Sequence, residues 1–390
     1  MVNNIKYRLT NWVDGMKIHK QHFIDSENAL LDAIRDTNAA LLTNFNFGLL
    51  PPVPGEKKSL EISILKPQSD NFILSLSLCR AITAGGSRIE IMPQFGQEII
   101  CEEKPGTTVS NTGRNSKQVN SFYAVVTADV FNRQPSGEPS PDEAPPRHPF
   151  ANPRYELHIV PEENVSAIDF GSHHFPVARF KTKGAELMQD DTYIPPCTAI
   201  QSHPAMIKLY NNIGNNLNRV QEFSTIIVQK VIGKSQNTPL AQNIKAICEK
   251  NVYYVSSIFF AFRMVLPYTS PVFIAETVAQ LASVLKVVLD FMPEKEKEEM
   301  LQYFKEWNET NPSAFQAMVA AAIEMEYDHY AIYESFLPAV NFLTRYAELL
   351  EKLSELELIG KRKEKDIFVR ELSVPDGGKP GKKKGFSLLD

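Results

Sequence analysis

The strongest constraint in this sequence is a change in its hydrophobic pattern near residue 200. Before that point, apolar and polar residues alternate in short runs, as in LEISIL at 60–65, FILSLSL at 72–78 and YELHIV at 155–160. Alternation with a period of two is typical of half-buried β-strands. After it, apolar residues recur every three or four positions, which is typical of amphipathic helices. The two separate blocks predict an α+β protein with a strand-rich half and a helical half.

The strand-rich half predicts a β-sandwich. Further alternating runs lie at 88–92, 122–130 and 175–180, with Gly, Pro and Asn residues between them. Many short strands joined by turns favour two packed antiparallel sheets. The segment 22–37 instead has apolar residues at helical spacing, so it predicts a helix before the first strand. We therefore expect three regions: a β-sandwich domain with an N-terminal segment and helix over 1–200, an α-helical bundle over 201–358, and a short flexible tail over 359–390.

A proline-rich segment interrupts the sandwich at 133–153. It holds seven prolines in 21 positions. Proline lacks a backbone N–H and fixes φ, so the segment is not a central strand or a helix interior. We expect a solvated insertion loop between two strands. A polyproline-type docking ligand is the alternative interpretation.

Three pairs of a capping residue and a proline mark helix starts in the second half. Thr238-Pro239, Ser270-Pro271 and Asn311-Pro312 each place a capping side chain before a proline at the first helical position. They predict helices that begin near 239, 271 and 312. Two longer helices are expected over 204–232 and 328–358.

The helix expected over 204–232 has the clearest apolar periodicity. Its apolar positions alternate between steps of four and three for more than three heptads, which is the pattern of a coiled-coil seam. Two interpretations fit: a long helix packed inside its own bundle, or a helix on an oligomer axis. β-Branched residues at both seam positions favour three or more strands over two. The seam consists of Met206, Tyr210, Ile213, Leu217, Val220, Ser224, Ile227 and Val231.

Composition excludes several classes of protein. With 41 Lys and Arg against 46 Asp and Glu, the net charge is −5, so the chain as a whole is not a nucleic-acid binder. No two of the four cysteines have CxxC spacing, and scattered free thiols fit a reducing compartment. The N-terminus lacks the apolar core of a signal peptide, and charged residues interrupt the two most apolar stretches, 252–266 and 272–291. We expect a cytoplasmic protein without a transmembrane helix.

The sequence shows no signature of catalysis. It contains no P-loop and no GxGxxG, GxSxG or HExxH motif. His19 and His22 are three residues apart, and His173 and His174 are adjacent. A zinc site needs three or four ligands, and no Cys, Asp or Glu cluster supplies the rest. We therefore expect no enzyme activity, cofactor, metal or small-molecule substrate.

The last residues are basic and polar. Residues 361–390 hold seven Lys and two Arg against five acidic residues, and they are rich in Gly and Pro. Such a segment is too polar to fold alone. Solvation of the whole tail is one interpretation, and a docking peptide near its end is the other. The docking residues would be Lys382, Lys383, Lys384, Phe386, Leu388 and Leu389.

Five short motifs carry a family resemblance. The first, WVDGMKIHKQHF at 12–23, is similar to the signature W-x-x-G-M-x-[apolar]-x-P-Q-H-F, with Lys20 in place of its proline. The others are NFGLL at 46–50, AGGSRIEIMP at 84–93, DTYIPPC at 191–197 and YDH at 327–329. In this order they resemble the TssK family, the baseplate subunit of bacterial type VI secretion systems. The matching signature residues are Trp12, Gly15, Met16, Gln21, His22 and Phe23.

The resemblance implies an architecture and a role. It implies a β-sandwich shoulder similar to siphophage receptor-binding proteins, a helical neck, and a homotrimer that connects TssF/TssG wedge subunits to the inner-membrane complex. It favours the seam as a trimer interface, and it implies recruitment to the cytoplasmic face of the inner membrane. The signature residues would lie at a partner or protomer interface, or would pack beneath the sandwich. The family also has a C-terminal head, and since about 30 residues follow Leu358, we expect the head to be absent or reduced to a peptide.

Two other classes stay open. One is a phage-like or other contractile-injection baseplate or receptor-binding protein with the same sandwich ancestry. The other is an enzyme whose motif is not recognisable, which a deep pocket lined by a perturbed His or carboxylate would indicate.

Overall fold

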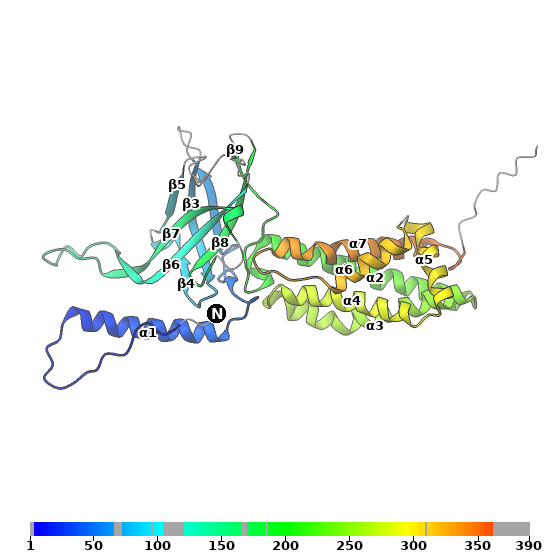
Figure 1. Cartoon of the computed structure of the whole chain (residues 1–390), viewed down its shortest axis with the longest axis horizontal. Helices are drawn as coiled ribbons and strands as arrows, with labels where there is room; N and C mark the ends of the chain where they lie inside the picture. Colours follow the sequence, from blue (N-terminus) through cyan, green and yellow to red (C-terminus); the bar gives the residue numbers. More distant parts are fainter. Residues whose placement is uncertain are drawn as a thin grey trace, which may run out of the picture.

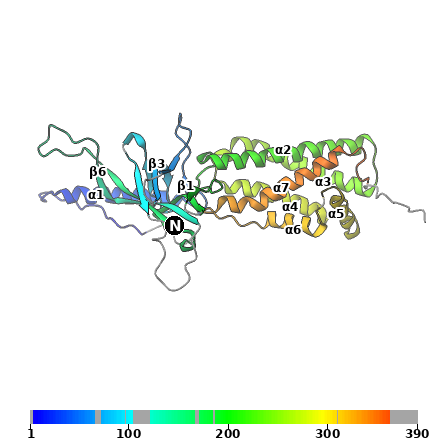
Figure 2. The ribbon, with the colours of Figure 1, turned by 90° about the horizontal axis from the view of Figure 1, so that it is seen from above.

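Two parts of different architecture lie end to end along the long axis of the molecule (Figures 1 and 2). We call the strand-rich part the shoulder and the helical part the neck. The computed structural model describes residues 4–65, 72–95, 97–103, 121–165, 170–183, 186–308 and 310–361. The last strand ends at Gln189 and the first neck helix begins at Pro204, so the change of pattern in the sequence corresponds to a change of architecture.

The shoulder holds two antiparallel sheets in its described residues, as the alternating runs predict. In the first, β3 (Phe72–Ile82) is central: it pairs with β1 (Gly48–Leu49), β2 (Leu60–Leu65), β4 (Arg88–Ile91) and β5 (Ile99–Glu103). The second has the order β7-β6-β8-β9. Its strands are β6 (Ser121–Ser136), β7 (Phe150–Pro161), β8 (His174–Lys183) and β9 (Glu186–Gln189).

Successive side chains of β6 pack on the two faces of the second sheet. Ala124 and Val126 join the main apolar core, which also contains Leu74 and Leu76 of the other sheet. Tyr123 and Val125 point to the opposite face and form a smaller cluster with Phe170 and Tyr193. Because successive side chains of a strand point to opposite faces, β6 contributes to two apolar layers.

The proline-rich segment is partly paired, which corrects the expectation of a loop over 133–153. β6 continues to Ser136 and β7 begins at Phe150, and Pro135 lies opposite Ala151 in a two-stranded ribbon. The ribbon extends beyond the sandwich (Figure 1). A strand without a further neighbour has an open edge, so a missing N–H is tolerated there. The unpaired loop is therefore limited to residues 137–149.

The expected N-terminal helix is present as α1 (Lys20–Leu41). It lies along the underside of the sandwich in Figure 1. The turn between β3 and β4 lies directly against α1. At Gly86, which has φ +82°, an added Cβ would lie only 2.3 Å from the Arg35 carbonyl oxygen. The Asn38 side chain also donates a hydrogen bond to the Gly86 carbonyl oxygen over 3.3 Å. Glycine in the third motif thus allows the close approach of α1 to the sheet.

The neck contains six helices in its described residues. Three begin as expected: α2 (Pro204–Gly233), α3 (Pro239–Met264) and α6 (Pro312–Ile323). The Thr238 side chain caps α3 by accepting a hydrogen bond from the Ala241 N–H over 3.3 Å. The helix α5 (Glu294–Asn308) was not predicted, since its first six residues, EKEKEE, are all charged and its buried residues begin only at Met300. The others are α4 (Val272–Asp290) and α7 (Ile332–Glu355).

α4 begins close to the expected position but with a different cap, and α7 begins later than expected. α4 begins at Val272 with Pro271 as its N-cap, and Ser270 instead donates its hydroxyl to the Phe45 carbonyl. α7 begins at Ile332 rather than Asp328. The Asp328 carboxylate accepts a hydrogen bond from the Tyr330 N–H over 2.9 Å, which favours a turn over a helix at this position.

One neck helix is apolar and long enough to cross a membrane by length and composition alone, namely α4. In the structure it packs within the bundle, where Ile274, Val278, Leu281 and Leu285 are buried. The core helix of a soluble bundle has the same composition, so this feature alone does not indicate a membrane span.

Candidate interaction surfaces

The N-terminal segment of residues 4–19, which we call the arm, is tied to α1. The Tyr7 N–H donates a hydrogen bond to Asp32 Oδ2 over 2.8 Å, and the Lys6 N–H donates to the same atom. Arg35 pairs with Asp32 at 2.6 Å and donates to the Asn4 carbonyl oxygen over 3.2 Å. The carboxylate of Asp32 is fully buried, so the arm satisfies hydrogen bonds that α1 leaves open.

The family signature forms the turn from the arm into α1. Gly15 lies in this turn with φ +79°, a conformation that favours glycine. The Trp12 ring centroid lies 6.1 Å from both His22 and Phe23. Trp12 and Phe23 are exposed, whereas Met16 and His22 are half-buried.

The remaining signature residue and the nearby histidines serve the helix start. Gln21 is exposed and donates a hydrogen bond to Asp25 over 2.7 Å. The His19 N–H donates to His22 Nδ1 over 3.2 Å, so this ring nitrogen acts in the helix cap. Among the described residues, no group of three or more His, Cys, Asp or Glu side chains is placed to hold a metal ion.

The polarity of α1 is inverted relative to an ordinary surface helix. Its buried residues include Asn28, Asp32 and Arg35, which face the shoulder. The apolar residues of the opposite face are exposed. Their spacing of seven, four and seven places them on one side of the helix. This set, which we call the α1 strip, consists of Phe23, Leu30, Ile34 and Leu41, with exposed fractions of 56–74%.

A cavity of about 310 Å³ lies between α1 and the shoulder strands. Leu31 and Ile34 of α1 line one side, and Val130, Pro153 and Tyr155 contribute apolar surface from β6 and β7. Ile34 therefore belongs both to the α1 strip and to the cavity lining. An exposed apolar strip that continues into a cavity is typical of a protein–protein interaction site.

Three of the five motifs meet where the shoulder joins the neck. The NFGLL motif supplies Phe47, whose carbonyl oxygen lies 2.8 Å from His329 Nε2 of the YDH motif. The Leu49 N–H donates to the carbonyl oxygen of Pro196, in the DTYIPPC motif, over 2.8 Å. Gly48 has φ +114°, and a Cβ there would lie 2.1 Å from that same oxygen. These motifs are far apart in the sequence, and together they form a joint.

Burial suppresses charge on His329 of the joint and on one further histidine, His203. Burial lowers the pKa of His329 to about 4, although its hydrogen bond to the Phe47 carbonyl opposes the shift. Burial likewise lowers the pKa of His203, the N-cap of α2, to about 4. A neutral His329 donates through Nε2, so Nδ1 accepts from the Tyr327 hydroxyl, which lies 2.8 Å away.

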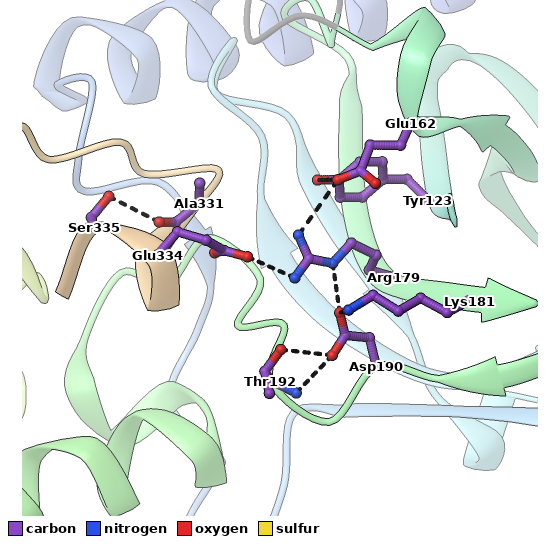
Figure 3. Close-up of polar contacts among 9 residues, drawn as sticks. All are labelled: Tyr123, Glu162, Arg179, Lys181, Asp190, Thr192, Ala331, Glu334 and Ser335. Carbon is purple, nitrogen blue, oxygen red and sulfur yellow. Dashed lines mark hydrogen bonds and ion pairs between the residues drawn. The ribbon is translucent and has the colours of Figure 1, made fainter. Parts of the chain in front are cut away.

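An ion-pair cluster lies beside the joint (Figure 3). Arg179 of β8 contacts Asp190 at 2.8 Å, Glu334 of α7 at 2.6 Å and Glu162 at 3.6 Å. Burial lowers the pKa of Arg179, but the hydrogen bond and charge of Glu334 outweigh burial and raise it. Arg179 thus links the second sheet directly to the first turn of α7.

Asp190 is the second centre of this cluster. Lys181 lies 2.8 Å from its carboxylate, and Thr192 donates to it from both its N–H and its hydroxyl. Burial raises the pKa of Asp190, but these hydrogen bonds and Arg179 outweigh it and hold the pKa well below its usual range. No pattern in the sequence predicted this cluster, because its members come from four separate segments that no motif connects.

The seam of α2 is buried inside its own chain, which corrects the expectation of a trimer axis along it. α2 packs against α3 and α7. Every seam residue except Tyr210 is buried, and Tyr210 stacks on Phe262 with ring centroids 4.7 Å apart. The buried Ser224 hydroxyl accepts a hydrogen bond from Asn251, which also donates to the Tyr346 hydroxyl. The periodicity of Met206, Ile213, Leu217, Val220, Ile227 and Val231 reflects packing within the bundle.

A different neck surface is apolar and exposed. On the side of α3 opposite its buried residues, Tyr253, Phe260 and Met264 have exposed fractions of 71%, 71% and 57%. We call these three residues the α3 face. Tyr268, in the turn after α3, is also exposed. In Figure 1, α3 and α1 lie on the same side of the molecule.

The possible docking residues of the tail, Lys382 to Lys384, Phe386, Leu388 and Leu389, lie outside the described residues. The described chain ends just after the neck. Ile359 is buried, and the Gly360 N–H donates to the Tyr303 hydroxyl over 3.1 Å.

Comparison with known proteins adds a likeness of fold. No protein-family model matches the sequence, and no curated protein matches it. Among solved structures, a crystal structure of TssK is 15% identical with a TM-score of 0.50, over 86% of this chain and 68% of that chain.

Two structures of larger assemblies agree with it. A chain of the type VI secretion system TssK-TssF-TssG baseplate subcomplex is 16% identical with a TM-score of 0.51, over 89% of this chain and all of that chain. A chain of the baseplate complex from the type VI secretion system is 15% identical with a TM-score of 0.52, over 88% and 99%. At this identity the likeness establishes the fold, and the chain is a protein with the fold of TssK.

Proposed function

We propose that this chain is a structural subunit of a type VI secretion baseplate. In this role it forms a homotrimer that connects TssF/TssG-like wedge subunits to the inner-membrane complex at the cytoplasmic face of the inner membrane, without catalysis. The observation that carries the proposal is the fold: both shoulder and neck are shared with chains from baseplate complexes over 88–89% of this chain. The joint supports it, because three family-like motifs meet there.

The α3 face supports the homotrimer. Large exposed apolar patches are uncommon on monomers and mark interaction sites. Aromatic residues and methionine are enriched at the cores of interfaces, and the α3 face consists of Tyr253, Phe260 and Met264. The buried seam leaves α2 without an outward apolar stripe, so we assign copy-to-copy contact to α3 instead.

The shoulder supports binding of the wedge. The N-terminal end of α1 points away from the neck (Figure 1). Phe23 lies in the first turn of this helix and Trp12 packs against it, and both aromatic residues are exposed. Large apolar side chains at this end of the molecule are available to a partner while the neck associates with other copies.

Co-expression with the wedge subunits tests the proposal. The chain is purified through a tag in the presence of TssF and TssG from the same secretion system, and the complex is weighed by light scattering. We expect both subunits to co-purify in a complex that contains three copies of this chain or a multiple of three. Purification of the folded chain without either wedge subunit would contradict the proposed function.

A further inference from the structure

The α1 strip exposes apolar side chains to solvent, whereas the opposite face of α1 buries the polar residues Asn28, Asp32 and Arg35. We propose that the α1 strip and the cavity beside it bind one amphipathic, acidic segment of a protein partner, whose largest apolar side chain enters the cavity. The inference rests on the proposed function in one respect, since it takes this partner to be a wedge subunit.

The first support is the geometry of the strip. Leu30 and Ile34 are one helical turn apart, with Phe23 and Leu41 one heptad beyond each. The Trp12 ring lies against Phe23 and extends the apolar surface into the arm. A row of apolar residues of this length matches the apolar face of a partner helix or an extended amphipathic segment.

The second support is the cavity beside the strip, which Ile34 also lines. Its volume of about 310 Å³ is within the range of pockets that hold a ligand group. The Gln97 Oε1 atom is buried and accepts no hydrogen bond from the described residues, and Gln97 lines this cavity. An apolar pocket with an open acceptor in its wall suits a side chain that enters together with a donor group. Anchor residues in such pockets usually dominate binding.

The third support is charge. Arg8, Lys17 and Lys20 are exposed at the arm and the start of α1, and the arm carries a single acidic residue, Asp14. None of these three cations forms an ion pair within the described part of the chain. Complementary charge between partners steers their association and fixes their register. The partner is therefore expected to place acidic residues over the arm.

The same charges disfavour a second copy of this chain as the occupant. Acidic residues of this chain gather on α5, with Glu294, Glu296, Glu298 and Glu299. α5 lies at the end of the neck far from the shoulder (Figure 1). In the proposed trimer the necks associate side by side through α3, so copies related by the cyclic axis meet at equal heights. The arm of one copy then does not reach α5 of the next.

A pair of neighbouring substitutions tests the inference. Ile34→Asp places a charge in the strip and the cavity. Ala33→Asp makes the same change of charge at the adjacent exposed position of α1, outside the strip. Binding of the purified wedge subunits is measured for the wild-type chain and both variants, after circular dichroism and solution mass show an unchanged fold and oligomer. We expect Ile34→Asp to weaken binding about tenfold or more, and Ala33→Asp to leave it within about threefold.

The salt dependence of wedge binding tests the contribution of charge separately. Wild-type affinity is measured between low and high salt, alongside the double variant Lys17→Ala and Lys20→Ala. We expect the variant to bind more weakly at low salt and to depend less on salt, because exposed charges are screened. Equal salt dependence of the variant and the wild type would contradict an acidic partner.

A photo-crosslinker at position 34 identifies the occupant. We expect it to capture an amphipathic wedge segment that contains Asp or Glu. Capture of a second copy of this chain, or unchanged wedge binding by Ile34→Asp, would overturn this inference and leave the proposed function intact. Failure of the wild-type chain to bind the wedge subunits would instead contradict the proposed function and remove the partner named here.

Discussion

The His329 ring bonds to the backbone of Phe47, 282 residues away in the chain, with 2.8 Å between Nε2 and the carbonyl oxygen. The rings also pack edge-on with centroids 4.8 Å apart. A carbonyl oxygen only accepts hydrogen bonds, so Nε2 carries the proton. This contact connects the segment before α7 to the segment before β1. The packing of the neck against the shoulder therefore depends on the protonation state of the His329 imidazole.

The first prediction is a loss of stability in mild acid. His329 has a pKa of about 4 in the folded chain and about 6.5 when unfolded, so the unfolded chain binds more protons between these values. The stabilising contribution is complete above about pH 6.5 and is lost as the pH falls toward 4. For a shift of this size it amounts to roughly 3 kcal/mol.

Urea unfolding at a series of pH values measures this effect. The variant His329→Gln keeps a side-chain N–H donor but does not titrate, so its free energy of unfolding should fall less between pH 6.5 and 4. His203 titrates in the same direction, and some pH dependence therefore remains. The exposed variant His158→Gln is the control. Identical pH profiles for His329→Gln and the wild type would show that His329 does not carry the effect.

The second prediction concerns the ion-pair cluster. Arg179→Met leaves Asp190 buried with only Lys181 as a cationic partner. Removal of one member of a buried pair costs about 3 kcal/mol in the free energy of unfolding. Glu334 is partly exposed, so Glu334→Gln should cost about 1 kcal/mol or less. Urea unfolding of both variants, with the exposed Glu355→Gln on α7 as control, checks this order, and an equal cost for all three would refute a central role for Arg179.

The third prediction contrasts two glycines in the left-handed region. Gly48 has φ +114° and is closely approached by the Pro196 carbonyl, whereas Gly55 has φ +95° and no atom within 4 Å of an added Cβ. Gly55→Ala should cost about 1 kcal/mol, from backbone strain alone. Gly48→Ala also meets the carbonyl that bonds to Leu49, so it should cost more than about 3 kcal/mol. Thermal unfolding compares them, and similar costs would contradict close packing at the joint.

The fourth prediction concerns the α3 face. Phe260→Asp places a charge at the centre of an exposed apolar patch, which a monomer tolerates and an oligomer contact does not. The variant should fold and behave as a monomer of 43.9 kDa. Val287→Asp on α4, also exposed, should leave the solution mass unchanged. A trimer formed by Phe260→Asp would show that copies associate elsewhere.

Features that depend on local sequence patterns could be predicted from the sequence. Local patterns decide strands and helix starts, so the alternating run at 72–78 and the Thr238-Pro239 pair located β3 and α3 correctly. The heptad spacing of α2 showed that one face is buried, but it did not show by which chain. An intramolecular and an intermolecular seam need the same spacing, and here α3 and α7 supply the contact.

Other features depend on tertiary contacts that local patterns do not reveal. An amphipathic helix ordinarily buries its apolar face. In α1 the polar residues Asn28, Asp32 and Arg35 are buried instead, because the arm and the shoulder supply their hydrogen-bond partners. The cluster around Arg179 was not predicted for the same reason. The motif glycines were the useful signal, since Gly15 and Gly48 both have positive φ and Gly48 also lies at a close approach.

The solution mass of the purified chain tests the central claim most directly. Native mass spectrometry or light scattering over a range of concentrations reports the number of copies without any partner. A trimeric baseplate subunit should give a mass near three times 43.9 kDa. A mass of 43.9 kDa that does not change with concentration would contradict the homotrimer, and with it the role proposed for the α3 face.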